Sequence, residues 1–284
     1  MIFWGGTFIA GRALAGLVQP CSSAFLRFVI ASVSLAGVAY IVDGRLALPP
    51  RRQWFLLFIL GLTGVFGYNF FFFSGLQYVE AGRASLIIAL NPLAITVLAT
   101  LLVGEKLSAR QMVGVLISLV GAVFVISNGK PFELLHGSFG RGELTILGCI
   151  VSWVTYSLVG RKVLQDLSPL NSVMYASIIG TVLLAIPALM EGLPQQISRI
   201  PLNSWGSLVF LGICGTTMGF SFYYQAIRDI GASRASVFIN LVPLCAIILS
   251  WLILGEAIKS SVITGGLLLL TGVSLTNYVA TEKS

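Results

Sequence analysis

The sequence predicts an all-α integral membrane protein with ten transmembrane helices, arranged as two inverted five-helix repeats. Three observations support this fold class: the composition, the spacing of the apolar runs and a segment that occurs twice. Only 10% of the 284 residues are charged and 57% are hydrophobic, and the mean hydropathy is +0.96. A soluble domain has about 25% charged residues, so a chain this apolar needs lipid as its solvent.

Ten apolar runs are each long enough to cross about 30 Å of hydrocarbon. They fall at residues 1–18, 22–42, 54–76, 83–103, 109–127, 143–160, 170–190, 204–226, 233–254 and 261–279. Turn-forming and charged residues separate the runs, as at Gln19-Pro20 and Gly104-Glu105. The runs do not alternate polar and apolar residues, which favours helices over the strands of a membrane barrel.

The first run is expected to be a membrane helix, although Ala13-Leu14-Ala15 resembles a signal-peptide cleavage site. Two features weigh against cleavage. No basic region precedes the run, and the run has a counterpart later in the chain, since Trp4, Gly11 and Arg12 match residues 149 positions further on.

The repeated segment divides the chain into two halves. Residues 83–105 read RASLIIALNPLAITVLATLLVGE and residues 234–256 read RASVFINLVPLCAIILSWLILGE, with 11 of 23 positions identical at an offset of 151. The same offset matches Trp54 with Trp205 and Gly121 with Gly272. We therefore expect one five-helix repeat at residues 1–127, a connecting loop at 128–142 and a second repeat at 143–279.

The odd number of helices in each half predicts how the halves are related. A copy that starts after five crossings enters the membrane from the opposite side, so the repeats should be related by an axis in the membrane plane. With the N-terminus inside, ten loop Lys and Arg lie on the cytoplasmic side and five lie outside. This excess favours a multi-pass protein of the inner (cytoplasmic) cell membrane with both termini in the cytoplasm.

The remaining composition favours a small-molecule solute and membrane lipids as partners. The 17 Lys and Arg are scattered singly between apolar runs, so neither nucleic acid nor an obligate protein partner is indicated. His136 is the only histidine, and the four cysteines show no metal-ligand spacing, so no metal site and no cofactor are expected.

Several motifs are similar to those of a known family. The start WGGTFIAGR (residues 4–12), the Leu26-Arg27-Phe28 of the second helix and the doubled Ala-Ser…Pro…Gly-Glu block resemble the EamA-type transporters of the drug/metabolite transporter superfamily. The resemblance covers essentially the whole chain and implies ten helices in two inverted repeats. Several bacterial members export amino acids and related metabolites, so the resemblance implies transport and leaves the solute open.

The predicted site lies where helices 4 and 9 are broken. Pro92 and Pro243 sit near the helix centres and each removes one backbone hydrogen bond, while Asn91 and Asn240 lie close by. One interpretation is a packing kink in which the Asn side chains tie neighbouring helices together. The other is a central site in which freed carbonyls and Asn amides bind an ammonium or a carboxylate group.

Aromatic residues of helices 3 and 8 are expected to complete the site. Phe72 and its repeat partner Tyr223 each lie three residues from a small residue that permits close packing, so they are assigned to the cavity face. Tyr156 and Thr7 are weaker candidates for the same cavity. Trp4 and Trp153 are expected in the aromatic belt at the membrane surface.

The charged residues are expected at the periphery. Arg12 and Arg27 lie in the outer third of their helices and should extend to the outer head groups, the alternative being a carboxylate partner at an outer vestibule. All ten acidic residues fall in loops or at helix ends. Glu105 and Glu256 follow the last glycines of helices 4 and 9, where they either mark ordinary helix ends or form gate salt bridges.

These features favour secondary transport over catalysis. The chain contains neither paired Asp in mid-membrane nor an HExxH motif, so we expect no enzyme. The expected function is an exporter that moves small neutral or zwitterionic metabolites, foremost amino acids, by alternating access. The alternatives are a sugar-phosphate, nucleotide-sugar or drug transporter of the same superfamily, or a non-transporting membrane scaffold.

Overall fold

The computed structural model describes residues 1–44, 48–91, 93–95, 97–98, 109–127, 129–131, 140–230, 235 and 238–277. Within these ranges the chain forms helices and no strand, which confirms the all-α class. The α-helices are α1 (Ile2–Leu14), α2 (Pro20–Asp43), α3 (Gln53–Leu60), α4 (Tyr68–Leu76), α5 (Ala81–Ile88), α7 (Ala109–Ile126), α8 (Arg141–Val163), α9 (Pro169–Met190), α10 (Leu193–Ile197), α11 (Leu202–Phe210), α12 (Gly219–Ile230), α14 (Leu241–Leu249) and α15 (Ser260–Asn277).

Five helical segments are long and apolar enough to cross a membrane. They are Pro20–Asp43, Gln53–Leu76, Arg141–Val163, Pro169–Met190 and Leu202–Ile230. The other predicted runs hold shorter apolar helices, such as the 13-residue α1 and Ser260–Thr276. The count of ten crossings therefore stays a prediction.

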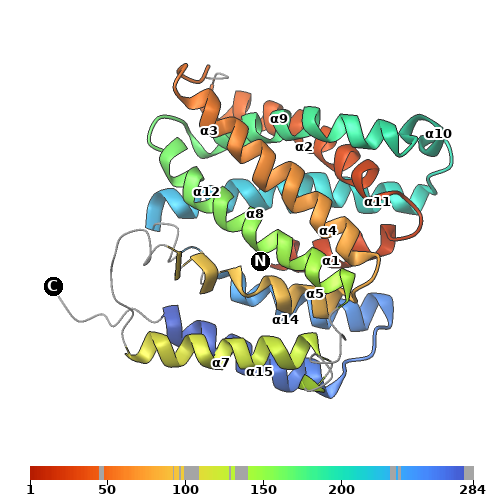
Figure 1. Cartoon of the computed structure of the whole chain (residues 1–284). Coiled ribbons are helices and arrows are strands. Elements are labelled where there is room, and N and C mark those ends of the chain that lie inside the picture. Colours follow the sequence, from red (N-terminus) through yellow and green to blue (C-terminus); the bar gives the residue numbers. More distant parts are fainter. Residues whose placement is uncertain are drawn as a thin grey trace.

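Helices α2 and α9 lie side by side and antiparallel, at one side of the bundle (Figure 1). Each begins with a proline at its first turn, where the missing N–H has no helical partner in any case. The carboxylate that follows α9, Glu191, accepts from the backbone N–H groups of Cys21 and Ser22 at 3.0 and 2.8 Å. At the other end Asp43 accepts from Asn171 at 2.6 Å. Each helix end thus carries a carboxylate that accepts hydrogen bonds from the start of its repeat partner.

Helices α7 and α15 pack together at the opposite side of the bundle (Figure 1). Their contact depends on glycines that allow the two backbones to touch. A Cβ at Gly114 would lie 2.7 Å from the Gly272 carbonyl oxygen, and a Cβ at Gly121 would lie 2.7 Å from that of Gly265. Gly114 and Gly265 are repeat partners, as are Gly121 and Gly272, so this antiparallel contact is reciprocal between the halves.

Two π-helical segments occupy equivalent positions in the two repeats. They are Gly61–Gly67, between α3 and α4, and Leu211–Met218, between α11 and α12. A Cβ at Gly61 would lie 2.7 Å from Ile179 Cγ2, and one at Gly212 would lie 2.7 Å from Ile30 Cγ2. Ile30 and Ile179 are themselves repeat partners at the offset of 149. These paired contacts support an inverted repeat. The relation of all five helices of one half to those of the other stays a prediction.

Large apolar side chains cover the outside of the bundle. On α2, Ile41 is 81% exposed, and on α9, Met190 is 83% exposed. A soluble protein does not display such side chains along whole helices, whereas lipid tails accommodate them. The outer surface therefore agrees with a multi-pass membrane protein.

Candidate functional site

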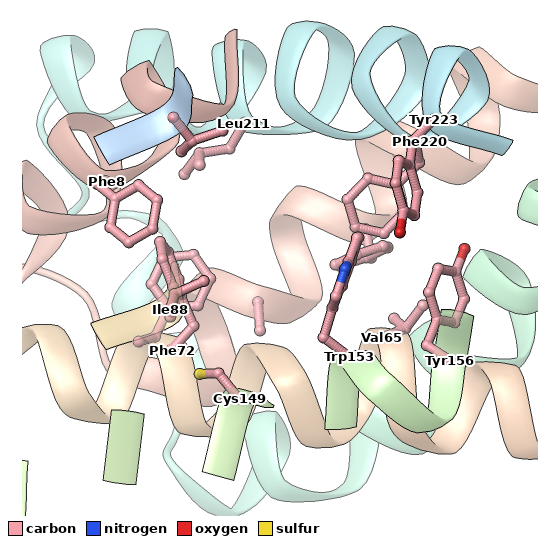
Figure 2. Close-up of a cluster of buried hydrophobic side chains, with 14 of the residues drawn as sticks. Phe8, Val65, Phe72, Ile88, Cys149, Trp153, Tyr156, Leu211, Phe220 and Tyr223 are labelled. Carbon is pink, nitrogen blue, oxygen red and sulfur yellow. The ribbon is translucent and has the colours of Figure 1, made fainter. Parts of the chain in front are cut away.

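A small cavity lies between the two halves, with a volume of about 40 Å³. It has room for a few water molecules. We call it the central cavity. Its lining consists of Trp4, Thr7, Phe8, Arg27, Tyr68, Phe72, Ile88, Asn91, Trp153, Phe220, Ile239 and Val242. Figure 2 shows Phe8, Phe72 and Ile88 gathered on one side and Trp153 and Phe220 on the other.

Repeat partners meet at this cavity. Trp4 and Trp153 lie edge to face, with ring centroids 5.4 Å apart and an interplanar angle of 90°. Trp4 Nε1 donates to the Gly215 carbonyl at 3.0 Å, inside the second π-helical segment. The expected place of these two residues in an interfacial belt is therefore wrong. Their indole rings pack against each other in the interior because both halves contribute one to the same point.

The helices that contain the repeated prolines are interrupted beside the cavity. α5 ends at Ile88, a turn covers Ala89 and Leu90, and helical residues resume at Asn91. In the second half a 3-10 turn, Phe238–Asn240, precedes α14. Ile88 and Ile239 are repeat partners that line the cavity, so both halves bring irregular backbone to the same place. Irregular backbone at membrane depth is tolerated where it lines a cavity.

Three of the predicted site residues line the central cavity: Thr7, Phe72 and Asn91. Thr7 donates its hydroxyl hydrogen to the Trp4 carbonyl at 2.6 Å, and Phe72 packs against Phe8 with ring centroids 5.2 Å apart. Asn91 is 2% exposed, and its Oδ1 has no hydrogen-bond partner among the described residues. A buried amide oxygen without a donor is costly, and a polar ligand would satisfy it.

Tyr223 and Tyr156 lie near the cavity and do not line it. Tyr223 borders a second space of about 300 Å³, which we call the N-terminal hollow because Met1 and Phe3 also line it. Trp4 lines both spaces. Tyr156 is fully buried, and its hydroxyl finds no partner within the described part of the chain. Its ring fills the room left by Gly64, where a Cβ would lie 2.1 Å from Tyr156 Cδ2.

Three other predictions fall partly or wholly outside the described residues. Pro92, Glu105 and the side chain of Asn240 are not described. Pro243 is buried and lies in the first turn of α14, directly after the 3-10 turn. A proline in a first helical turn removes an N–H that has no helical acceptor, so the interruption precedes Pro243.

Glu256 takes part in a contact between helix ends. Its carboxylate lies 3.7 Å from Arg12 Nε and accepts from the backbone N–H of Ala81 at 3.3 Å. Arg12 also donates to the Leu76 carbonyl at 2.5 Å. Glu256 therefore joins α1, the start of α5 and the end of the segment that follows α14. Gly255 ends the preceding segment with a φ of 66°, so Glu256 follows a helix end and also forms an ion pair; a gate role stays a prediction.

Arg27 differs most from its expected position. Its side chain does not extend to the head groups, because the residue is 3% exposed and lines the central cavity. Nε donates to Thr216 Oγ1 at 2.9 Å and Nη1 donates to Asn69 Oδ1 at 3.0 Å. A signal in the sequence was available. Arg27 lies four residues from both Ser23 and Ala31, and small residues at that spacing mark the packed face of a membrane helix.

Sequence comparisons place the chain among transporters. A family model described as the EamA-like transporter family matches residues 1–127 and 140–278. An uncharacterized transporter of Bacillus subtilis, YyaM, is 32% identical over 272 residues, which cover 96% of this chain and 89% of the relative. An uncharacterized transporter of Archaeoglobus fulgidus is 29% identical over 286 residues, which cover 99% and 95%.

A third relative has a more specific name, "Probable terminal-alkyne amino-acid exporter", and comes from Streptantibioticus cattleyicolor. It is 27% identical over 281 residues, which cover 98% of this chain and 90% of the relative. A solved crystal structure shares the fold with a TM-score of 0.66 at 21% identity, covering 97% of this chain and 94% of its own. On the match of both halves to one family model, this chain belongs to the EamA-like transporter family.

Proposed function

We propose that the protein is a secondary transporter that exports small neutral or zwitterionic metabolites, foremost amino acids, across the cytoplasmic membrane. Transport proceeds by alternating access between two inverted five-helix repeats, residues 1–127 and 143–279, which the loop 128–142 joins. Both termini lie in the cytoplasm. Membership of the transporter family supports the general class, and the named amino-acid exporter among the relatives supports the choice of solute.

The central cavity is the observation on which this proposal depends. In transporters built from inverted repeats, the solute site lies at the interface of the repeats near the middle of the membrane. Here repeat partners from both halves, Trp4 with Trp153 and Ile88 with Ile239, enclose one cavity. The Oδ1 of Asn91, which has no partner among the residues that the structure describes, is available to an ammonium group, and the indole rings add a cation–π attraction of about 0.5–2 kcal/mol. A cavity of this size is too small for an amino acid, so the structure corresponds to a closed conformation that must open to admit a solute.

The surroundings of the cavity suggest the two routes. On the proposed topology α1 begins at the cytoplasmic face, so the N-terminal hollow is the inner approach and Trp4 is its barrier. The contact between Arg12 and Glu256 closes the outer side. We propose Glu256 as part of the outer gate and Glu105, its repeat partner, as part of the inner one.

Counterflow into liposomes tests the proposal. Purified protein is reconstituted with a loaded solute, and uptake of the labelled solute is followed for amino acids, sugars and cationic dyes. Gly215→Val should abolish counterflow, because a Cβ there already meets Thr7 Cγ2 at 2.6 Å. The matched control is Gly37→Val, because a Cβ at Gly37 meets nothing within 4 Å. Parent protein that moves no solute faster than empty liposomes, or a Gly215→Val variant that transports like the parent, contradicts the proposal.

A further inference from the structure

Arg27 is a buried cation held by neutral oxygens. Its two hydrogen-bond acceptors are the side-chain oxygens of Asn69 and Thr216, each of which is fully buried. A second hydrogen bond fixes the orientation of each side chain. Asn69 Nδ2 donates to the Val65 carbonyl at 2.8 Å, and Thr216 Oγ1 donates to the Leu211 carbonyl at 2.9 Å. Both oxygens are thereby aimed at the guanidinium, and neither neutralises its charge.

The described part of the chain supplies Arg27 with no carboxylate. Seven of the ten acidic residues are described, and each is engaged at a helix end. Their partners lie elsewhere: Asp43 binds Asn171, Glu80 binds Lys259, Glu143 binds Arg83, Asp166 binds Arg52, Glu191 binds Ser22, Asp229 binds Gln225 and Glu256 binds Arg12. A buried cation without a counter-charge is strongly unfavourable in a low-dielectric interior.

Part of the guanidinium is available to a ligand in the central cavity. A guanidinium has five N–H donors, and the bonds to Asn69 and Thr216 use two of them. No described group accepts from Nη2. Nη2 lies 3.6 Å from the place that a Cβ at Gly215 would take, beside Thr7, so the glycine leaves this edge of Arg27 open. Arg27 and Thr7 both line the cavity.

We infer that Arg27 is the anchor for a carboxylate group of the solute, so that the site requires a cargo with a carboxylate and rejects analogues that lack it. The inference rests on the proposed function and narrows its solute class. A carboxylate matches the open edge of a guanidinium and brings the single negative charge that Arg27 lacks. A phosphate ester brings nearly two negative charges, and among the described residues Arg27 is the only Lys or Arg that lines the cavity. The apolar walls then receive the rest of the molecule.

Matched probes that differ in one charged group test this inference. One set is phenylalanine, 3-phenylpropionate and phenethylamine, and a smaller set is alanine, propionate and ethylamine. Counterflow in liposomes and binding to the full chain in detergent are measured for each probe. We expect the parent to bind the probes that carry a carboxylate at least ten-fold more tightly than the amine of the same set.

Three variants locate the effect. Arg27→Gln should weaken binding of the carboxylate probes about ten- to a hundred-fold, the usual loss for a hydrogen bond to a charged group. It should also abolish the preference over the amines, which a loss of packing alone would not do. Asn69→Asp gives Arg27 an internal carboxylate and loses the hydrogen bond from Nδ2 to the Val65 carbonyl, so it should weaken binding of the same probes. Monodispersity and thermal unfolding in detergent show whether this variant is folded. Arg52→Gln, which removes an exposed charge at the helix ends, should bind like the parent.

The outcomes separate the inference from the proposed function. Equal binding of amine and carboxylate probes by the parent overturns the inference, as does parent-like binding in folded Asn69→Asp. If Arg27→Gln fails to fold, Asn69→Asp and the probe sets still decide. Counterflow of sugars or dyes alone overturns the inference and leaves the proposed transport function standing. Absence of counterflow for every solute in the panel overturns both.

Discussion

Two regions that the repeat makes equivalent, one around Arg27 and the other around Ala176, differ in their chemistry. Arg27 is held by the amide of Asn69 and the hydroxyl of Thr216. The positions equivalent to these three residues are apolar and buried. The equivalent pairs, at offsets of 149 and 151, are Arg27 with Ala176, Asn69 with Phe220 and Thr216 with Val65. The site is thus asymmetric even though the scaffold repeats.

Away from the cavity the two halves keep the same contacts. A Cβ added at Gly61 would lie 2.7 Å from Ile179 Cγ2, and one added at Gly212 would lie 2.7 Å from Ile30 Cγ2. The contrast between the asymmetric site and these symmetric contacts reflects two separate requirements. Alternating access needs two nearly equivalent helix packings, which favours equal contacts in both repeats. A bound solute has one orientation, so one anchor at one of the two positions is sufficient.

The strongest test of the comparison places an arginine on the apolar side. Ala176→Arg buries a charge where the equivalent neighbours, Val65 and Phe220, offer no side-chain acceptor. We expect a loss of about 3–5 kcal/mol in the free energy of unfolding, enough to prevent folding. The recovery of monodisperse protein and its thermal unfolding in detergent measure this. Adding Val65→Thr and Phe220→Asn should restore part of the loss, and a single variant as stable as the parent would refute the comparison.

A second test uses the pair at the interrupted helices. Asn91→Ala should weaken binding of a transported amino acid by about 1.5–3 kcal/mol, or roughly ten- to a hundred-fold, because it removes the free buried acceptor. Its repeat partner Val242 has no polar atom in the side chain, so Val242→Ala should weaken binding much less. Binding to folded protein in detergent gives both numbers. Equal effects of the two substitutions would show that Asn91 contributes only volume.

A third test concerns the symmetric contacts. Gly61→Ala and Gly212→Ala each push a methyl group against an isoleucine, so each should cost about 1–3 kcal/mol in the free energy of unfolding. The two losses should agree within error, since the two contacts have the same geometry. Gly37→Ala, which adds a methyl group in open space, is the control. Clearly unequal losses would mean that the repeats do not pack alike.

The smallest expected effect on stability is at the proposed outer gate. The side chains of Arg12 and Glu256 are 31% and 15% exposed, so Glu256→Gln should change the free energy of unfolding by less than about 1 kcal/mol. If the lost contact destabilises the closed conformation by the same free energy, the barrier to opening falls and the counterflow rate should rise up to roughly five-fold. An unchanged rate in folded, reconstituted protein would exclude a gate role for this contact.

The sequence predicted the fold class well because lipid imposes simple requirements. Long apolar runs bounded by Pro20 or Pro169 can only be helices, and the structure contains both as predicted. Asn91 was assigned to the cavity because it lies beside a repeated helix break, and Phe72 because a small residue lies three positions away. These signals depend only on position along the chain.

The errors concern the direction of side chains around the helices. Arg27 and Trp4 were placed by their distance from a helix end, which predicts depth and says nothing about the face on which a residue lies. Arg27 faces the interior because α2 packs against Gly212, and Trp4 because its repeat partner occupies the same point. Tyr156 fills the space left by Gly64, a pairing between two distant segments that no local pattern reveals.

The glycine contact between α7 and α15 has a consequence for how the chain is made. α7 ends at Ile126 and α15 begins at Ser260, so ribosomes that add roughly 5–20 residues per second need on the order of 10–30 s to synthesise the segment between them. During that interval the Gly114 and Gly121 face of α7 lies in the bilayer without its partner. The first half therefore completes its packing only after the last helix has emerged, and a chain that stops before Ser260 leaves the glycine face open to other membrane helices.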